Sequence, residues 1–161
     1  MRGHTGQPSG GAGCRLKTSD GAVQACNAFA LGRDVARNFF LVHHPILGFE
    51  PNPAQNATSL YPGTQALQSV LPPIDGRQLF LANVEALLSG HNHLFEMVSF
   101  ATSQPAQLIL GNGGAWAAAP LPVGLARTTQ PAAEAVIESN VSTSKFGFVA
   151  MERGTVGEVA H

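Results

Sequence analysis

The chain carries little charge and few acidic groups. Only 12% of its 161 residues are Asp, Glu, Lys or Arg, and the formal net charge is −1. Nucleic acids and anionic membranes select surfaces with clustered Lys and Arg, so we predict no nucleic-acid partner. No apolar run approaches the roughly 20 residues of a membrane-spanning helix. The first 16 residues also lack the apolar middle of a secretory signal, so we expect neither feature in the chain as given.

Cysteine is scarce as well, with two residues, Cys14 and Cys26. A disulfide between them and two free buried thiols are both compatible with this spacing. The cellular compartment therefore stays open at this stage.

The length and the many chain-breaking residues predict a single domain of short elements. A chain of 161 residues is long enough to bury one hydrophobic core. Its 18 glycines and 11 prolines are spread along the sequence, which favours many short elements joined by loops. Residues 1–20 are polar and without period, so we interpret them as a loose or non-native tail, with the domain in residues 21–161.

Hydrophobic periodicity predicts an α/β (α+β) chain. Residues 22–37 have helical spacing, whereas the apolar run Phe39–Val42, stopped by Pro45, is typical of a buried central strand. Residues 64–73 and 75–83 are predicted to be partly helical. Further strands are predicted in 84–89, 94–102 and 106–110, and a closing hairpin in 134–140 and 145–153. We expect irregular loops at 48–63, 111–114 and 115–133.

Histidines follow two of the predicted buried strands. His43 and His44 come after the first, and His91 and His93 come after the second in the segment "SGHNH". Functional groups gather where the strands of an open α/β sheet end, because the strand holds them while the loop leaves them accessible. In an extended chain, residues i and i+2 point the same way, so His91 and His93 are predicted to face one cavity.

This pattern predicts a metal site. Neutral imidazole is the commonest protein ligand for Zn, Fe, Mn or Ni, although a single histidine more often has a structural role. We assign metal binding to His43, His91 and His93, and a catalytic role through the metal to His91. His44 and Asn92 are expected to support these ligands or contact substrate. His4 and His161 lie near the ends of the chain and are expected to be solvated.

These motifs resemble a known family. The segments "FLVHHPILGF", "LLSGHNHLFE", "QLILGNGG" and "FGFVAMER", across residues 38–153, are similar to the C-terminal half of the calcineurin-like metallophosphoesterases, which include the purple acid phosphatases. The resemblance implies the second half, mainly the second sheet, of a four-layer αββα sandwich. It also implies hydrolysis of phosphate mono- or diesters by a metal-activated hydroxide. By motif position, His43 and His91 would bind one metal ion of the Fe, Zn or Mn type, and His93 the other.

The chain departs from the family pattern in its carboxylates. The family also uses Asp-x-His, Gly-Asp-x-x-Asp and Gly-Asn-His segments. This chain has three aspartates, Asp20, Asp34 and Asp75, and none stands in those contexts. We therefore expect an incomplete fragment that binds one metal ion or none. The alternative from another class is a catalytically inactive remnant that serves as a metal-binding or interaction module.

Two further expectations follow from an incomplete sandwich. Half of the fold would leave a sheet face and a sheet edge uncovered, which favours self-association. The loops at 48–63 and 115–133 would determine which substrate is selected. Arg77, Arg127 and Asn92 are candidates to contact phosphate, and each is also interpretable as an ordinary polar residue. Tyr61 and Trp116 either line the mouth of the site or pack on the core.

Overall fold

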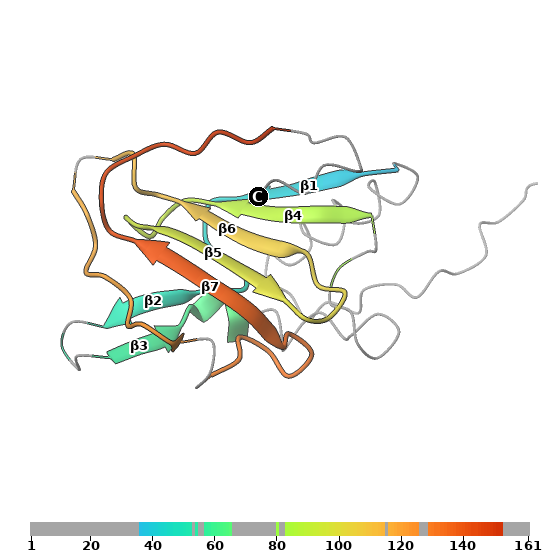
Figure 1. Ribbon diagram of the computed structural model, residues 1–161, viewed down its shortest axis with the longest axis horizontal. Helices are drawn as coiled ribbons and strands as arrows, with labels where there is room; N and C mark the ends of the chain where they lie inside the picture. The colour runs from blue at the N-terminus through green and yellow to red at the C-terminus, as the bar shows by residue number, and fades with distance from the viewer. Residues whose placement is uncertain are drawn as a thin grey trace, which may run out of the picture.

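A mixed five-stranded sheet dominates the chain, and a two-stranded hairpin lies beside it (Figure 1). The computed structural model describes residues 36–52, 54, 57–65, 80, 83–114, 116–125 and 129–152. Residues 62–65 are helical. At this coarse level the predicted α+β class is confirmed. The strands are β1 (Asn38–Val42), β2 (Phe49–Asn52), β3 (Ala57–Leu60), β4 (Val84–Ser89), β5 (Phe95–Phe100), β6 (Ala106–Leu110) and β7 (Ile137–Thr143).

The strand order of the large sheet is β1-β4-β6-β5-β7. Strands β1, β4 and β6 are parallel, whereas β5 runs antiparallel to both β6 and β7. The carboxyl ends of β1, β4 and β6 therefore lie together along the side of the sheet at which the strands end, where β5 begins. We call this side the carboxyl edge. All the histidines in the described part of the chain follow β1 or β4 at this edge.

The sequence of β5 separates the two faces of the sheet. Glu96, Val98 and Phe100 are buried, while the alternate residues Phe95, Met97 and Ser99 are partly exposed. This alternation is the one predicted from the period of two. We call the face that carries Glu96 and Val98 the inner face, and the opposite one the outer face.

The core lies on the inner face, between the sheet and the β2 side of the molecule. One buried cluster joins the sheet to the β1–β2 connection through Leu47, and a second cluster packs around Phe49 of β2. The first comprises Leu47, Phe80, Val84, Leu87, Val98, Phe100, Ala132 and Ala135, and the second Phe49, Leu94, Leu121 and Leu125.

A buried glutamine fixes the β1–β2 connection to the sheet. The Oε1 atom of Gln107 accepts hydrogen bonds from the backbone N–H groups of Ile46 and Leu47, both at 3.2 Å. Its Nε2 atom donates to the hydroxyl of Ser89 at 3.0 Å and to backbone carbonyls of the sheet. Because this amide is fully buried, losing a partner would leave an unsatisfied polar group. The His43–His44 segment is thereby held close to the end of β4.

Two expectations about strands are wrong. Residues 48–63 do not form an irregular loop, because Phe49–Asn52 and Ala57–Leu60 pair as an antiparallel hairpin. Residues 145–152 form no strand, so β7 closes the sheet without a hairpin partner there. The expected loops at 111–114 and in the described part of 115–133 are confirmed.

The prediction of a central first strand is also wrong. Within the described sheet, β1 lies at the edge and pairs with β4 alone. Its side chains alternate, so that Phe40 packs on the inner core while Phe39 and Leu41 are exposed. The apolar run therefore predicted a strand correctly, but it did not predict whether the strand lies at the centre or at the edge of the sheet.

Several predictions fall outside the described residues. These are the loose tail at 1–20, most of the helix at 22–37, most of 64–83, both cysteines, and Arg77, Arg127, His4 and His161. No helix in the described part of the chain has the length and apolar character needed to cross a bilayer.

Candidate metal centre

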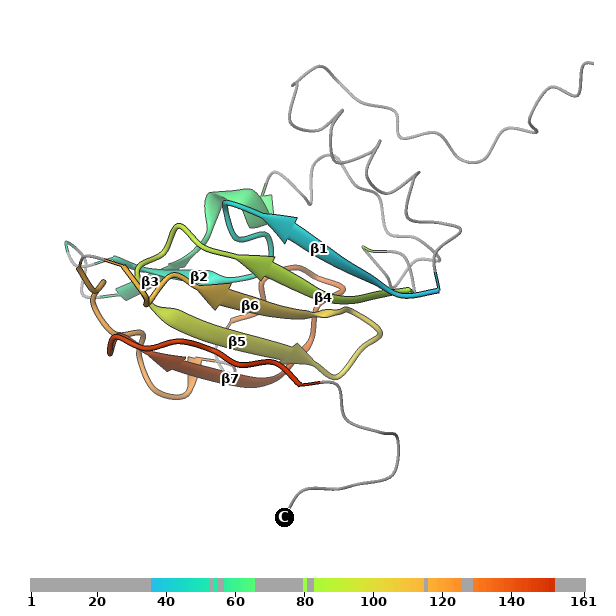
Figure 2. The same cartoon turned by 90° about the horizontal axis from the view of Figure 1, so that it is seen from above.

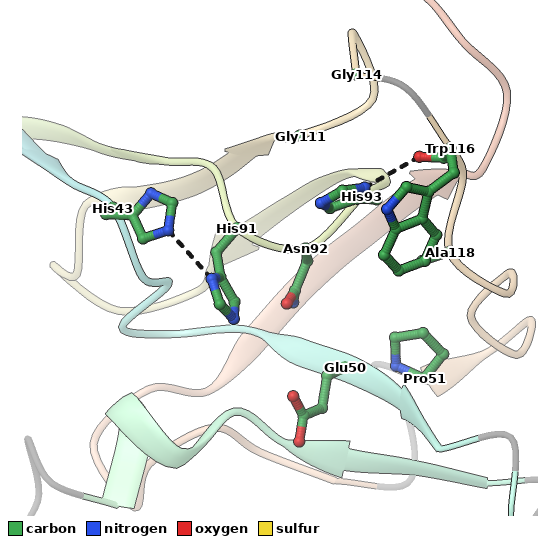
Figure 3. A pocket seen from close by; sticks show the side chains of 10 residues that line it. All are labelled: His43, Glu50, Pro51, His91, Asn92, His93, Gly111, Gly114, Trp116 and Ala118. Carbon is green, nitrogen blue, oxygen red and sulfur yellow. Dashed lines mark hydrogen bonds between the residues drawn. The ribbon is translucent and has the colours of Figure 1, made fainter.

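His43 and His91 meet at the carboxyl edge of the sheet, as the strand-end pattern predicted. Strands β1 and β4 are parallel neighbours, and the backbone N–H of Gly90 donates to the carbonyl of His43 at 3.1 Å. Nε2 of His43 lies 3.2 Å from Nδ1 of His91 (Figure 3). Two residues 48 positions apart in sequence thus present nitrogen atoms to the same point in space.

The third histidine of the cluster is His44 rather than His93. One ligand nitrogen from each of His43, His44 and His91 lies within 4.8 Å of the others, and all three residues are exposed. The ring centroids of His44 and His91 are 4.0 Å apart. Nδ1 of His44 forms a hydrogen bond with the hydroxyl of the buried Tyr61. We call His43, His44 and His91 the histidine cluster.

The backbone at His91 is not extended. Its φ angle is 65°, the left-handed region that few non-glycine residues adopt, although histidine does so more often than most. The chain is therefore not extended from His91 to His93, although both residues line one pocket as the sequence predicted. The left-handed turn directs the ring of His91 toward the end of β1.

His93 lies on a different side of the same pocket. Its Nδ1 donates to the carbonyl oxygen of Trp116 at 3.1 Å, and the two rings are tilted with centroids 4.1 Å apart (Figure 3). This hydrogen bond places the proton on Nδ1 and leaves the Nε2 lone pair free to accept a bond. His93 is therefore prepared for ligand binding but lies outside the histidine cluster.

Asn92 fixes the histidine loop to β2. Its side chain is buried, and Nδ2 donates to the carbonyl of Phe49 at 3.1 Å. The residue also borders the pocket. Its Nδ2 is engaged by the protein, which supports the predicted supporting role.

A glycine allows the turn after β6 to approach this loop. A side chain at Gly111 would place its Cβ 1.7 Å from the carbonyl oxygen of Asn92, well inside van der Waals contact. The Gly111 N–H donates to the carbonyl of Leu94 at 3.1 Å. Only glycine fits this position, and its absence of a side chain lets the 111–114 turn form one wall of the pocket.

The pocket has a volume of about 450 Å³, within the range of small-molecule sites. The cluster members His43 and His91 line one end, and Trp116 lines the other (Figure 3). Glu50 supplies the one carboxylate among the described lining residues, and Ser59 donates to its Oε1 at 3.3 Å. The lining residues are His43, Glu50, Pro51, Asn92, His91, His93, Gly111, Gly114, Trp116 and Ala118.

The surroundings of His91 favour its neutral form. Desolvation lowers its pKa from the ordinary value, and the neighbouring imidazoles of His44 and His43 lower it further. The carboxylate of Glu50 opposes this shift by raising the pKa. A metal ion binds the neutral imidazole, so a lowered pKa reduces competition from protons.

Sequence reasoning missed some of the residues that build this site. Glu50 lay in a segment interpreted as an irregular loop, and His44 was expected only beside the ligands. Trp116 lines the pocket, whereas Tyr61 packs in the core and reaches His44 with its hydroxyl. The alternation of a "Glu-Pro-Asn" stretch is too short to have revealed β2, so no pattern in the sequence pointed to Glu50.

Comparison of the chain with models of protein families, with curated proteins and with solved structures finds no match.

Proposed function

We propose that the histidine cluster binds a divalent transition-metal ion and that the protein hydrolyses phosphoesters at this centre. The observation that carries the proposal is the meeting of three imidazoles within 4.8 Å at the end of an accessible pocket. Neutral imidazoles of this kind suit Zn²⁺ and related ions. The resemblance of the histidine motifs to the metallophosphoesterases supplies the reaction class.

The spacing of the cluster suits one ion. Two nitrogens bound to Zn²⁺ at about 2.0–2.1 Å in tetrahedral geometry lie about 3.3 Å apart. Nε2 of His43 and Nδ1 of His91 are separated by 3.2 Å. His44 would complete the set through its Nε2, since its Nδ1 is bonded to Tyr61. Three histidines leave a fourth position open for water or substrate, as in catalytic zinc sites.

The protein residues would bind, orient and surround the ester. A metal ion held by these histidines would supply Lewis-acid chemistry, which polarises a phosphoryl oxygen and lowers the pKa of a bound water. His93, with its proton held on Nδ1 by Trp116, can accept a proton or hydrogen bond through Nε2. Asn92 holds the loop against β2, so that its neighbours His91 and His93 are kept in position.

The family resemblance leads to a finer proposal for the fold and the metal count. The five-stranded sheet would correspond to the second sheet of a four-layer αββα sandwich. His93 would then carry a second metal ion beside the one bound by His43 and His91.

A metal-binding module without catalysis is the second candidate. It is favoured by the scarcity of carboxylates, because Glu50 is the one acidic residue among the described lining residues and Ser59 already contacts it. A two-metal centre usually needs a bridging carboxylate, and none stands within the histidine cluster.

A metal titration coupled to a hydrolysis assay tests the proposal. We expect the chelator-treated chain to bind one Zn²⁺ by calorimetry and to hydrolyse p-nitrophenyl phosphate or its diester. His91→Asn removes the imidazole while asparagine tolerates the left-handed backbone. We expect this change to weaken Zn²⁺ binding by more than about 100-fold and to abolish hydrolysis, since loss of mere supporting residues already costs about 10–100-fold.

Ser103→Asn is a matched control, because Ser103 is exposed in the β5–β6 connection at the far end of β5. It should leave both measurements unchanged. Hydrolysis that survives His91→Asn would refute the catalytic role, and Zn²⁺ binding without hydrolysis would favour the binding module. A stoichiometry of two ions that falls to one in a His93→Asn variant would support a second ion at His93.

A further inference from the structure

Glu50 brings a carboxylate to the histidine end of the pocket. It lies on β2 and lines the same pocket as His43 and His91. In Figure 3 its side chain points away from Trp116, and the ring of His91 extends toward β2. The end of the pocket that could hold a metal ion therefore also carries the one acidic side chain among the described lining residues.

A hydrogen bond between their chain neighbours keeps Glu50 close to His91. Nδ2 of Asn92, the residue after His91, donates at 3.1 Å to the carbonyl of Phe49, the residue before Glu50. The N–H of Phe49 donates to the buried carboxyl group of Glu96 at 3.2 Å. Both backbone polar groups of Phe49 are thus engaged, so Glu50 is held beside the histidine loop by a fixed strand.

The carboxylate of Glu50 has one oxygen without a hydrogen bond among the described residues. Ser59, its partner across the β2–β3 hairpin, donates to Oε1 at 3.3 Å and leaves Oε2 available. The one ion pair in the described part of the chain joins Arg37 and Glu85, so no Lys or Arg there neutralises Glu50. Such a carboxylate at a pocket wall can accept a proton or a hydrogen bond from a ligand.

The charge of Glu50 also acts on the histidine cluster and its support. Burial is the larger cause of the shifted pKa at both His91 and Tyr61, and the charge of Glu50 raises the pKa of each. Since His91 is a cluster member and Tyr61 bonds His44, the carboxylate is electrostatically coupled to the place where an ion would bind.

We propose that Glu50 is the general base for hydrolysis at this centre, an assignment that rests on the proposed function. In the described part of the chain, the ligand atoms that gather within 4.8 Å of one another belong to the histidine cluster and do not include Glu50. A carboxylate that faces the ligands but is set back from them acts on a water at the open position and not as a ligand.

In the proposed step, Oε2 of Glu50 removes one proton from the attacking water while the water oxygen forms its bond to phosphorus. The bond from phosphorus to the ester oxygen breaks, and that oxygen leaves with the bonding electrons and takes up a proton from solvent. Glu50 then releases its own proton to solvent, so one water is consumed and the carboxylate is regenerated. His93 lies outside the histidine cluster, beside Trp116, so Glu50 and not His93 faces the water in this step.

Glu50→Gln tests the base, because it keeps the size of the side chain and removes its ability to accept the proton. We expect kcat for bis(p-nitrophenyl) phosphate to fall by at least about 100-fold, as for the loss of a general base. Nitrophenolate leaves without needing a proton, so this substrate reports the attack by water. The affinity for Zn²⁺, measured by competition with a dye, should change by less than about fivefold. Glu138→Gln, at an exposed position of β7, is the matched control and should change neither quantity.

Azide binding locates the charge of Glu50 without any reaction. Azide takes the open position of a metal ion in place of water, and a neighbouring carboxylate repels its negative charge. In the Co²⁺-loaded chain, followed by visible absorption, Glu50→Gln should therefore bind azide about threefold to tenfold more tightly than the unmodified chain. Glu138→Gln should bind azide like the unmodified chain. A carboxylate with a merely structural role would not produce this difference.

Three results would overturn the assignment: unchanged hydrolysis in Glu50→Gln, an azide affinity that does not respond to that change, or a large loss of Zn²⁺ affinity, which would make Glu50 a ligand. If hydrolysis is lost in His91→Asn but kept in Glu50→Gln, the proposed function stands and the base alone is refuted. If the Zn²⁺-loaded chain hydrolyses no ester, the proposed function fails and the base role with it, and the azide difference alone would persist.

Discussion

At the scale of single residues, Tyr61 determines how His44 can act. Its hydroxyl bonds Nδ1 of His44, and burial, followed by the charge of Glu50, raises the pKa of Tyr61 above its ordinary value. The hydroxyl therefore stays protonated at neutral pH and can accept a hydrogen bond from the Nδ1–H of a neutral imidazole. That arrangement leaves Nε2 of His44 for the metal ion and holds the ring orientation.

We predict that Tyr61→Phe weakens metal binding without unfolding the protein. Residues that orient a histidine ligand typically contribute about 10–100-fold to metal affinity, so we expect a loss of about tenfold. The phenyl ring keeps the packing of Tyr61, so the thermal transition of the metal-free chain should change little. Competition with a zinc-sensitive dye measures the affinity. An unchanged affinity would exclude His44 from the ligand set.

The sequence predicted the meeting of His43 and His91, because both follow parallel strands that end at one edge. It did not predict His44 in the cluster. Adjacent residues of an extended strand point to opposite sides, yet His43 and His44 lie in a bend beyond Val42, where that alternation no longer holds. The left-handed backbone at His91 could not be predicted from the sequence either, since it depends on the loop geometry between β4 and β5.

At the scale of elements, a buried carboxyl group joins β2 to the large sheet. Glu96 of β5 is fully buried, and its Oε2 accepts a hydrogen bond from the Phe49 N–H at 3.2 Å. Its Oε1 accepts one from Nδ2 of Asn140 on β7 at 2.7 Å. Burial raises the pKa of Glu96 to about 7, although both hydrogen bonds act to lower it.

This shift predicts that the fold loses stability as pH rises. The folded state favours the neutral carboxyl, so the contribution of Glu96 is complete below its ordinary pKa of 4.5 and is lost as pH rises toward about 7. The difference between the two pKa values corresponds to about 3 kcal/mol. Urea unfolding between pH 4.5 and 8 measures it.

The matched variant for this prediction is Glu96→Gln, which keeps a neutral group of the same size. Its free energy of unfolding should fall less than that of the unmodified chain over this pH range. Comparing the two chains removes the contribution of the histidines, which titrate in both. Parallel pH profiles would show that Glu96 does not ionise in this range.

Most strands of the large sheet were predictable, while the β2–β3 hairpin was not. Strands β4, β5 and β6 are flanked on both sides, and each is marked by a short stretch rich in apolar residues; in β5 the burial of the side chains also alternates. The hairpin contains Pro51 in a strand and further loop-forming residues, which hide any alternation. Apolar and polar residues alternate in 145–152, but this segment forms no strand. Alternation alone does not create a strand, because a strand also needs a neighbouring strand to pair with.

At the scale of the whole molecule, the outer face of the sheet presents apolar side chains. Leu41 of β1 is 71% exposed and Phe39 is 50% exposed. Both lie beside Ala86 and Leu88 of β4 in the parallel register. Met151 borders the same surface with Phe39 and Leu88. Figure 2 shows β1 at one edge of the five-stranded sheet.

We propose that the chain associates with itself through this face and edge, since exposed apolar patches and unpaired strand edges both promote association. Leu41→Lys places a charge on the edge strand, and we expect it to shift the chain toward monomer at equal concentration. Analytical ultracentrifugation over a dilution series measures this shift. Val123→Lys, at a fully exposed loop position, is the control. A monomeric unmodified chain would contradict the proposal.

The missing side chain of Gly111 has a consequence for observing the site in solution. Its amide N–H donates to the carbonyl of Leu94, just after the histidines, and a Cβ at this position would collide with the carbonyl oxygen of Asn92. Any rearrangement of the histidine loop should therefore change the chemical environment of the Gly111 amide. A single glycine cross-peak in a ¹⁵N spectrum would report occupancy of the site without a label on any imidazole.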